Sequence, residues 1–302
     1  MSVALKLGYM LALLGVGLVA KSTGVVTESR RDRLTVFAFY IALPALVFSS
    51  TYAQPISEVV TPTLMLGLWA VMFLMIGVSL LVHRSIAGRG ARSVAIVQSY
   101  HSNFGFLGLP LVASTFGPIT TAKASIILGV GSLTQVPVTV ALLVSINDAD
   151  VAFRDELVEV FKTPVIPALV TGLLFSYFGL GVPSVVASGL DAVASLALPV
   201  ALVCVGASLS AERESFDART VGSVVGLKVF LMPILALLVF SAMGSDWSTV
   251  QAGVTMLAAP TAVSTFVYAT ELGGDPRLAS MNVFVTTVVS VGTLLAVLRF
   301  LL

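Results

Sequence analysis

The sequence predicts an all-α integral membrane protein, because its composition, its charge and the length of its apolar runs agree. The chain has 302 residues, of which 57% are hydrophobic, and its mean hydropathy is +1.05. Charged residues make up 10%, so a water-soluble globule would lack the polar surface to cover itself. A disordered chain or a nucleic-acid-binding protein is excluded as well, because the formal net charge is only +1 and the apolar content is high.

Ten apolar runs approach the roughly 20 residues that a helix needs to cross the hydrocarbon core. They cover approximately 3–20, 34–53, 63–82, 93–113, 121–146, 164–179, 190–209, 220–243, 249–270 and 277–300. The connections between them are short. We therefore expect ten transmembrane helices and no extramembrane domain.

Basic residues gather in alternate connections, which predicts the orientation of the chain. Twelve of the sixteen lie in the odd-numbered connections: Lys21, Arg30, Arg31, Arg33, Arg84, Arg89, Arg92, Arg154, Lys162, Arg213, Arg219 and Arg277. The even-numbered connections hold none apart from Lys123, at the edge of the fifth run. Short cytoplasmic loops retain Lys and Arg, so we expect a multi-pass protein of the plasma membrane with both termini outside.

The two halves of the chain repeat each other. Three proline-containing segments recur in the same order at nearly constant spacing: Pro44 with Pro199, Pro110 with Pro260, and Pro118 with Pro276. Five spans then form one repeat, over residues 1–150, and five form the other, over residues 151–302. Because five is odd, the second copy enters the membrane from the opposite side, so the repeat is inverted. An amphipathic stretch at 151–161 is predicted to join the halves as an interfacial helix.

The fourth and ninth runs are each predicted to be broken at a proline. The fourth is the most polar, and Gly105 and Gly108 precede Pro110, so we expect its break near 107–110. The ninth is expected to break near 259–260. In an inverted pair, the half-helices after the breaks direct their positive ends inward, which suits an anion. The alternative is two ordinary proline kinks whose backbone groups are satisfied by neighbouring Ser and Thr.

The same segments carry a resemblance to a known family. The sequence S-N-F-G-F-L-G-L-P from Ser102 to Pro110 resembles the S-N-x-G-F-x-G-L-P signature of the auxin efflux carriers. The segments 259–263 and 271–276 resemble the second signature of that family, and 40–46 and 226–228 fit it as well. The similarity covers essentially the whole chain. Two positions depart from it: Thr270 stands where the family has a basic residue, and Leu272 where it has an aromatic one.

The resemblance implies a ten-helix carrier whose broken helices 4 and 9 cross, related in fold to the bile-acid and sodium/proton carriers. Helices 1, 2, 6 and 7 would form a scaffold that also dimerises, and helices 3–5 and 8–10 would move as a transport unit. It implies organic-anion substrates, either auxin-like or mono- and dicarboxylates such as malate or malonate. Asn103 matches the substrate-pocket asparagine of the family, and Pro110 and Pro260 match its crossover prolines.

The candidate substrate-binding residues are Asn103, Pro110, Leu111, Gln135, Pro260, Thr261 and Ser264, with His101 and Lys228 as further possibilities. Lys228, the one formal charge well inside a run, could attract an anion or could snorkel to the interface. His101 could bind substrate or carry a proton, although on a helix it would point away from Asn103, which favours a structural role. The hydroxyls after the second break could donate to a carboxylate or bond to their own helix.

The scarcity of carboxylates and cysteines argues against several classes of function. No carboxylate lies in the middle of a run, which argues against a proton antiporter built on paired acids and leaves sodium coupling open. With one cysteine, Cys204, no disulfide framework, Cys-based zinc site or other cofactor is expected, and the chain carries no hydrolase motif that would indicate an enzyme.

We therefore expect a secondary carrier of small organic anions that works by alternating access, of the elevator type, in contact with the lipid bilayer and a second copy of itself. The alternatives are a sodium-coupled symporter of the bile-acid-carrier type, or a channel or signalling membrane protein.

Overall fold

The computed structural model of the chain describes residues 3–149, 163–208 and 217–302, and within these residues the fold is helical, without a β-strand. The stretch at 151–161 and the boundary between the two halves lie outside the described residues. The helices are α1 (Val3–Ser22), α2 (Glu28–Phe37), α3 (Leu43–Tyr52), α4 (Ile56–Val59), α5 (Pro62–Val82), α6 (Arg89–Gln98), α7 (Leu109–Thr115), α8 (Pro118–Asn147), α10 (Val165–Tyr177), α11 (Ser184–Ser195), α12 (Ala197–Ser208), α13 (Ala218–Val225), α14 (Met232–Ala242), α15 (Trp247–Ala258), α16 (Ser264–Glu271) and α17 (Pro276–Leu301), with the π-helical turns η1 (Ala38–Ala42), η2 (Phe104–Gly108) and η3 (Gly226–Leu231).

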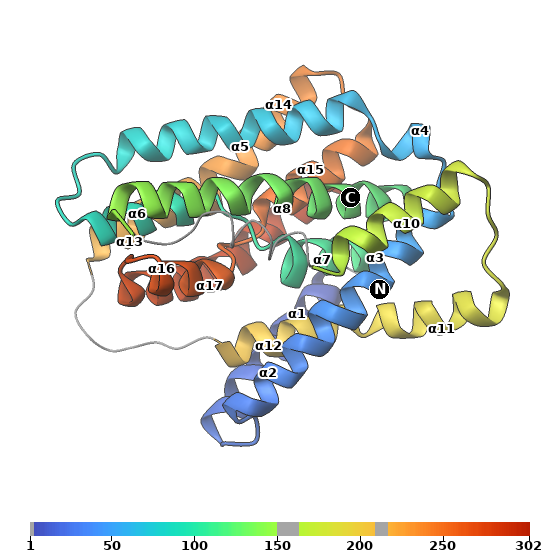
Figure 1. The fold of residues 1–302 in the computed structure, drawn as a ribbon, viewed down its shortest axis with the longest axis horizontal. Helices are drawn as coiled ribbons and strands as arrows, with labels where there is room; N and C mark the ends of the chain where they lie inside the picture. The colour runs from blue at the N-terminus through green and yellow to red at the C-terminus, as the bar shows by residue number, and fades with distance from the viewer. Residues whose placement is uncertain (1–2, 150–162, 209–216) are drawn as a thin grey trace.

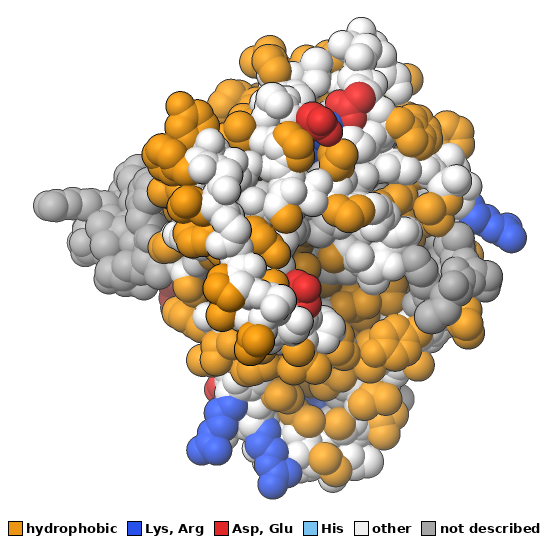
Figure 2. Space-filling model, turned by 90° about the vertical axis from the view of Figure 1, so that its right-hand side faces the viewer, with side chains coloured by type: hydrophobic (Ala, Val, Ile, Leu, Met, Phe, Trp, Pro, Cys, Tyr) orange, Lys and Arg blue, Asp and Glu red, His pale blue; other side chains and the backbone are white. Residues whose placement is uncertain are grey.

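Among the described residues, six helical segments are long and apolar enough to cross a membrane, so the ten predicted spans are confirmed only in part: 28–52, 56–82, 118–147, 184–208, 218–242 and 276–301. Three apolar helices are shorter, at 8–22, 104–115 and 165–177. Large hydrophobic side chains on these segments are exposed, among them Leu81 and Tyr177. On the face in Figure 2, hydrophobic side chains are spread over much of the surface, and the protruding Lys and Arg side chains lie at its margins. This distribution suits a surface covered by lipid rather than water.

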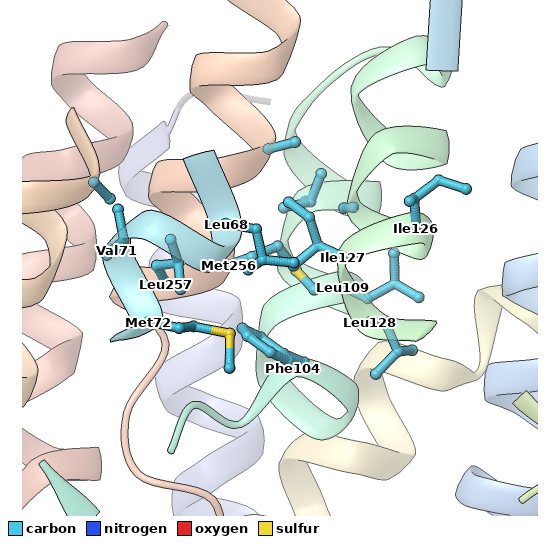
Figure 3. Packing of buried hydrophobic residues seen from close by; sticks show 14 of the residues in the cluster. Leu68, Val71, Met72, Phe104, Leu109, Ile126, Ile127, Leu128, Met256 and Leu257 are labelled. Atoms are coloured by element: carbon cyan, nitrogen blue, oxygen red, sulfur yellow. The ribbon is translucent and has the colours of Figure 1, made fainter. Parts of the chain in front are cut away.

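The helices form two groups with α8 between them (Figure 1). On one side, α1 packs along α12, and α12 also contacts α2. On the other side, α14 contacts both α5 and α15. Figure 3 shows side chains of α5, α8 and α15 in one apolar cluster with Phe104 of η2, which lies beside Met72. The central turn η2 is thus held in the largest apolar cluster of the described residues.

Polar contacts join loops at the two opposite ends of α8. Near its start, the buried Lys123 donates to Asp246, the N-cap of α15, at 2.7 Å. Partial burial of Asp246 raises its pKa, but hydrogen bonds from Lys123 and from two hydroxyls outweigh this and hold the pKa well below its usual range. Near the end of α8, Asn147 donates to the carbonyl of Leu272 at 2.8 Å, and Asp148 pairs with Arg89. The connections near residues 89, 147 and 272 therefore lie together at one end of the molecule.

Each of the three π-turns ends two residues before a proline. They end at Ala42, Gly108 and Leu231, and Pro44, Pro110 and Pro233 follow. Proline lacks an N–H and clashes with the carbonyl four residues back. In a π-turn the hydrogen bonds join residues five apart instead of four, so the proline is accommodated without a broken helix.

The break in the fourth run therefore lies elsewhere than the sequence predicted. Residues 107–110 are helical, and the interruption lies between α6 and η2, at 99–103. Asn103 caps the new helix, because its side-chain oxygen accepts from the N–H of Phe106 at 3.1 Å. The prediction placed the break at the proline, but the η2 turn absorbs it there. In the ninth run the predicted position is confirmed, since α15 ends at Ala258 and α16 begins at Ser264.

Candidate functional site

The two interrupted segments cross each other at the centre of the fold. Residues 99–103 and 259–263 run antiparallel at the crossing, where Ser102 and Thr261 form an isolated β-bridge. The N–H of Asn103 donates to the carbonyl of Pro260 at 2.9 Å, and the N–H of Ala262 donates to the carbonyl of His101 at 3.2 Å. Each broken segment therefore satisfies part of the backbone of the other, as a dry interior requires.

Gln135 of α8 holds the first segment from one side. Its side-chain oxygen accepts from the N–H of Ser102 at 3.1 Å, and its side-chain nitrogen donates to the carbonyl of Ser102 at 3.0 Å. A side-chain amide thus pairs with the backbone as a neighbouring strand would. Gln135 is buried, and its two hydrogen bonds fix the unwound conformation of Ser102.

Gln98 of α6 holds the crossing from the other side. Its backbone carbonyl accepts from the hydroxyl of Thr261 at 2.7 Å, and its side-chain nitrogen donates to the hydroxyl of Thr265 at 2.9 Å. Asn282 of α17 donates to the side-chain oxygen of Gln98 at 2.8 Å. These four residues are buried and tie both breaks to α17.

Lys228 of η3 links the two breaks directly. Its ammonium donates to the hydroxyl of Ser102 at 2.5 Å and to the carbonyl of Leu257 at 3.0 Å. Leu257 lies in the last turn of α15, where unpaired carbonyls and the helix dipole favour a cation. Lys228 is fully buried, so it does not snorkel, and it makes no ion pair with any described carboxylate.

A cavity of about 280 Å³ lies against the crossing. Its walls come from η1, both breaks, α8, the start of α10, and α16. They are formed by Phe39, His101, Ser102, Asn103, Phe104, Gly105, Phe106, Leu128, Ser132, Gln135, Val136, Thr163, Val165, Ile166, Ala262, Val263, Ser264 and Tyr268. None of these lining residues is an Asp, Glu, Lys or Arg, and the ammonium of Lys228 lies directly behind Ser102.

The half-helices after the breaks bring free hydrogen-bond donors to this cavity. The backbone N–H groups of Gly105, Val263 and Ser264 donate to no other described residue. The same holds for the side-chain nitrogen of Asn103, whose oxygen is engaged in the cap. All four residues line the cavity. A lining that offers several donors, with no acid among its residues, is chemically suited to an anion.

The structure brings four of the sequence-predicted residues together at the cavity: Asn103, Gln135, Ser264 and His101. His101 and Asn103 both line it because their segment is not helical, so the helical argument that separated them does not apply. One ring nitrogen of His101 lies 2.8 Å from the hydroxyl of Thr139.

The other five predicted residues do not line the cavity. Pro260 and Thr261 are buried inside the crossing, and Lys228 stands behind it. Pro110, four residues after the cavity-lining Phe106, lines a different cavity. Leu111 packs in an apolar cluster with residues of α1 and α12.

Sequence reasoning missed the aromatic wall. Phe39 and Phe106 line the cavity, and their rings stack with centroids 6.1 Å apart and planes at 29°. Phe39 lies in a continuous apolar run, where no local pattern distinguishes a cavity-lining side chain from a lipid-facing one. The proline at 44 was the available signal, because the π-turn before it contains Phe39.

Comparison with known proteins identifies the family. The family described as membrane transport protein matches residues 6–151 and 151–298. The chain belongs to this family, the auxin efflux carriers. A Rhizobium meliloti (strain 1021) protein named "Putative malonate transporter" is 25% identical over 289 residues, covering 88% of this chain and 85% of its own. A Methanothermobacter thermautotrophicus protein named "Uncharacterized transporter" is 25% identical over 293 residues, 94% of each chain. The chain is therefore a member of a family of membrane transport proteins.

Proposed function

We propose that this auxin efflux carrier family member is a secondary carrier of small organic anions and that the cavity at the crossing is its substrate site. One observation carries the proposal: three free backbone N–H groups and the amide nitrogen of Asn103 belong to residues lining one cavity. Bound there, a carboxylate would accept hydrogen bonds from the starts of two helices, where the helix dipoles favour negative charge.

The electrostatics support an anion rather than a cation. The ammonium of Lys228 is one side chain away from the cavity, through the hydroxyl of Ser102, and no described carboxylate pairs with it. In a low-dielectric interior such a charge acts over several ångströms. A bound anion would offset it, whereas a bound cation would add to it. The apolar walls contributed by Phe39, Phe106 and Ile166 would hold the carbon skeleton.

The proposed carrier has ten transmembrane helices arranged as two inverted repeats. The geometry that supports this is the crossing itself, since one interruption comes from each half of the chain. Helices 1, 2, 6 and 7 would form the scaffold, and the remainder would move as an elevator-type transport unit between two access states. We propose the plasma membrane as its location, with both termini outside, and a homodimer joined through the scaffold.

Malonate is the first substrate to test, because one relative carries that name. The experiment is uptake of radiolabelled malonate, malate and indole-acetate into proteoliposomes that contain the purified chain. At least one anion should accumulate above protein-free vesicles, and unlabelled substrate should compete with it. If the chain moves none of these or other small carboxylates, the proposed substrate class is wrong.

Asn103→Asp separates substrate binding from helix capping. The aspartate retains an oxygen that can cap the N–H of Phe106, but it replaces the donor with a negative charge. We expect an unchanged melting temperature and at least about tenfold lower uptake, which corresponds to the loss of roughly 1.4 kcal/mol of binding. Ser132→Ala is the matched control, because Ser132 lines the same cavity without bonding to another described residue. Equal uptake by the two variants would contradict the assignment of Asn103.

The coupling ion is tested in the same vesicles. Uptake is measured with a sodium gradient, with a proton gradient and with neither. A requirement for sodium would favour the symporter alternative, for which oxygens at broken helices supply a plausible chemistry.

A further inference from the structure

A second cavity, of about 510 Å³, lies beyond η2 along the same helices, towards the start of α8. Its lining includes Leu46 and Ser50 of α3, Pro110 and Ser114 of α7, Thr121 of α8, Leu198 of α12 and the acid Asp191 of α11. Helices α3 and α8, together with the turn η2 that precedes α7, also form the barrier between the two cavities.

The barrier is about one to two helical turns thick. Along the chain, Phe39 lines the central cavity and Leu46 the second one, and Phe106 and Pro110 are related in the same way. At 1.5 Å per residue these intervals span roughly 6–10 Å. On α8, the fully buried Ser125 separates the residues that line the two cavities.

Three of the contacts across this layer join the 38–52 segment to η2 or α8 through side chains whose geometry is defined. The hydroxyls of Ser50 and Ser125 lie 2.8 Å apart. A methyl group added to Gly105 would meet the side chain of Leu43 at 3.4 Å, so Leu43 packs against the bare backbone of η2. The stacked rings of Phe39 and Phe106 close the layer on the side of the central cavity. None of the three is an ion pair.

The Ser50 contact is built to open without leaving its hydroxyl unsatisfied. Ser50 also donates to the carbonyl of Val47 at 3.0 Å within its own helix, and that bond survives when Ser125 moves away. Behind it, α3 is fixed to α10, because Gly172 lies directly against Thr51. Separation at the layer would therefore move α8 and η2 relative to α3.

We propose that the layer made by Leu43, Ser50, Gly105 and Ser125 is the gate that separates the substrate cavity from the second cavity. It opens when η2 and α8 move past α3 as part of the transport unit, and the substrate site then communicates with the second cavity. This inference rests on the proposed transport function. It adds the position of the barrier and the residues that form it.

The test is a reversible disulfide across the layer. Ser50→Cys and Ser125→Cys are combined in a Cys204→Ala background, which removes the one native thiol. Hydroxyl oxygens 2.8 Å apart place the two sulfurs near bonding distance. Oxidation should lower anion uptake at least about tenfold, reduction should restore it, and each single-cysteine variant should be insensitive to the oxidant. Substrate-induced thermal stabilisation should persist in the crosslinked protein, because its central cavity is intact.

A second measurement does not depend on the disulfide. Ser132→Cys, in the same cysteine-free background, reports access to the central cavity by a membrane-impermeant thiol reagent. Adding Leu43→Ala should speed its labelling from the side of the membrane on which Pro118 lies, and should not speed it from the other side.

The outcomes separate the gate from the function. A reduced variant that transports no anion contradicts the proposed function. Full crosslinking with undiminished transport overturns the gate, and so does failure of the pair to crosslink. Labelling of Ser132→Cys that is indifferent to Leu43→Ala also overturns it.

Discussion

Replacing Gln135 by leucine tests whether one side chain holds the unwound segment in place. Gln135 makes two hydrogen bonds to the backbone of Ser102, at 3.1 and 3.0 Å, and both residues are buried. Leucine has a comparable size but can neither donate nor accept. The N–H and the carbonyl of Ser102 would then lose their side-chain partners in the interior.

The expected loss of stability follows mainly from the N–H of Ser102, because the carbonyl of Ser102 keeps a hydrogen bond from the N–H of Phe104 at 3.0 Å. A buried donor left unsatisfied costs about 1–3 kcal/mol, so we expect a loss within that range. For a chain of this size each kcal/mol lowers the melting temperature by about 2 °C, which gives a decrease of about 2–6 °C.

The assay is thermal unfolding of the detergent-solubilised protein, followed by intrinsic fluorescence. Hydrogen exchange at the amide of Ser102 should accelerate in the variant. Ser132→Ala, which alters the same cavity from the same helix without removing a bond, should leave both measurements unchanged. If Gln135→Leu behaves like Ser132→Ala in unfolding and in exchange, Gln135 does not hold the crossing and the reasoning is refuted.

Three further predictions concern packing, charge and pH. Gly17→Ala should lower the melting temperature, because an added methyl would overlap the backbone of α12, whereas Gly15→Ala, with open space around it, should not. Lys228→Met should reduce anion uptake at least about tenfold without preventing folding, and uptake equal to that of the native protein would contradict a role for its charge. The depressed pKa of Asp246 means that its contact with Lys123 stabilises the fold above the unfolded pKa near 3.8 and is lost as pH falls through the lower folded value. Asp246→Asn should therefore lower the melting temperature near neutral pH. The melting temperature of the variant should also fall less steeply as the pH is lowered, and a pH dependence identical to that of the native protein would exclude this contribution.

The positions of several long helices could be predicted from the sequence, because in a lipid environment a long apolar run is a nearly sufficient signal for a helix. A chain that must satisfy its backbone internally forms helices wherever it is apolar for long enough. The predicted run at 121–146 is the helix Pro118–Asn147, and the run at 277–300 is Pro276–Leu301. The polar stretch at 98–103 was equally visible, because such a composition inside a span has few structural explanations.

The geometry of the site could not be predicted from the sequence, because it depends on contacts between residues far apart in the chain. Proline at 110 indicated a break, yet the chain breaks at 99–103, because the π-turn accommodates the proline and the partner segment at 259–263 pairs with the freed backbone. Gln135 looked like a cavity wall, and only its position opposite Ser102 shows that its amide supports the crossing.

Composition and motifs were enough to predict a helical membrane protein, its family and the two interrupted segments. Which polar groups in those segments are engaged and which are free depends on the folded arrangement. Hydrophobicity is a local property of the chain, whereas hydrogen-bond satisfaction depends on residues more than a hundred positions away, as Lys228 and Ser102 are. Asn103 could be named from a motif, but its free donor is recognised only where two helices begin at one cavity.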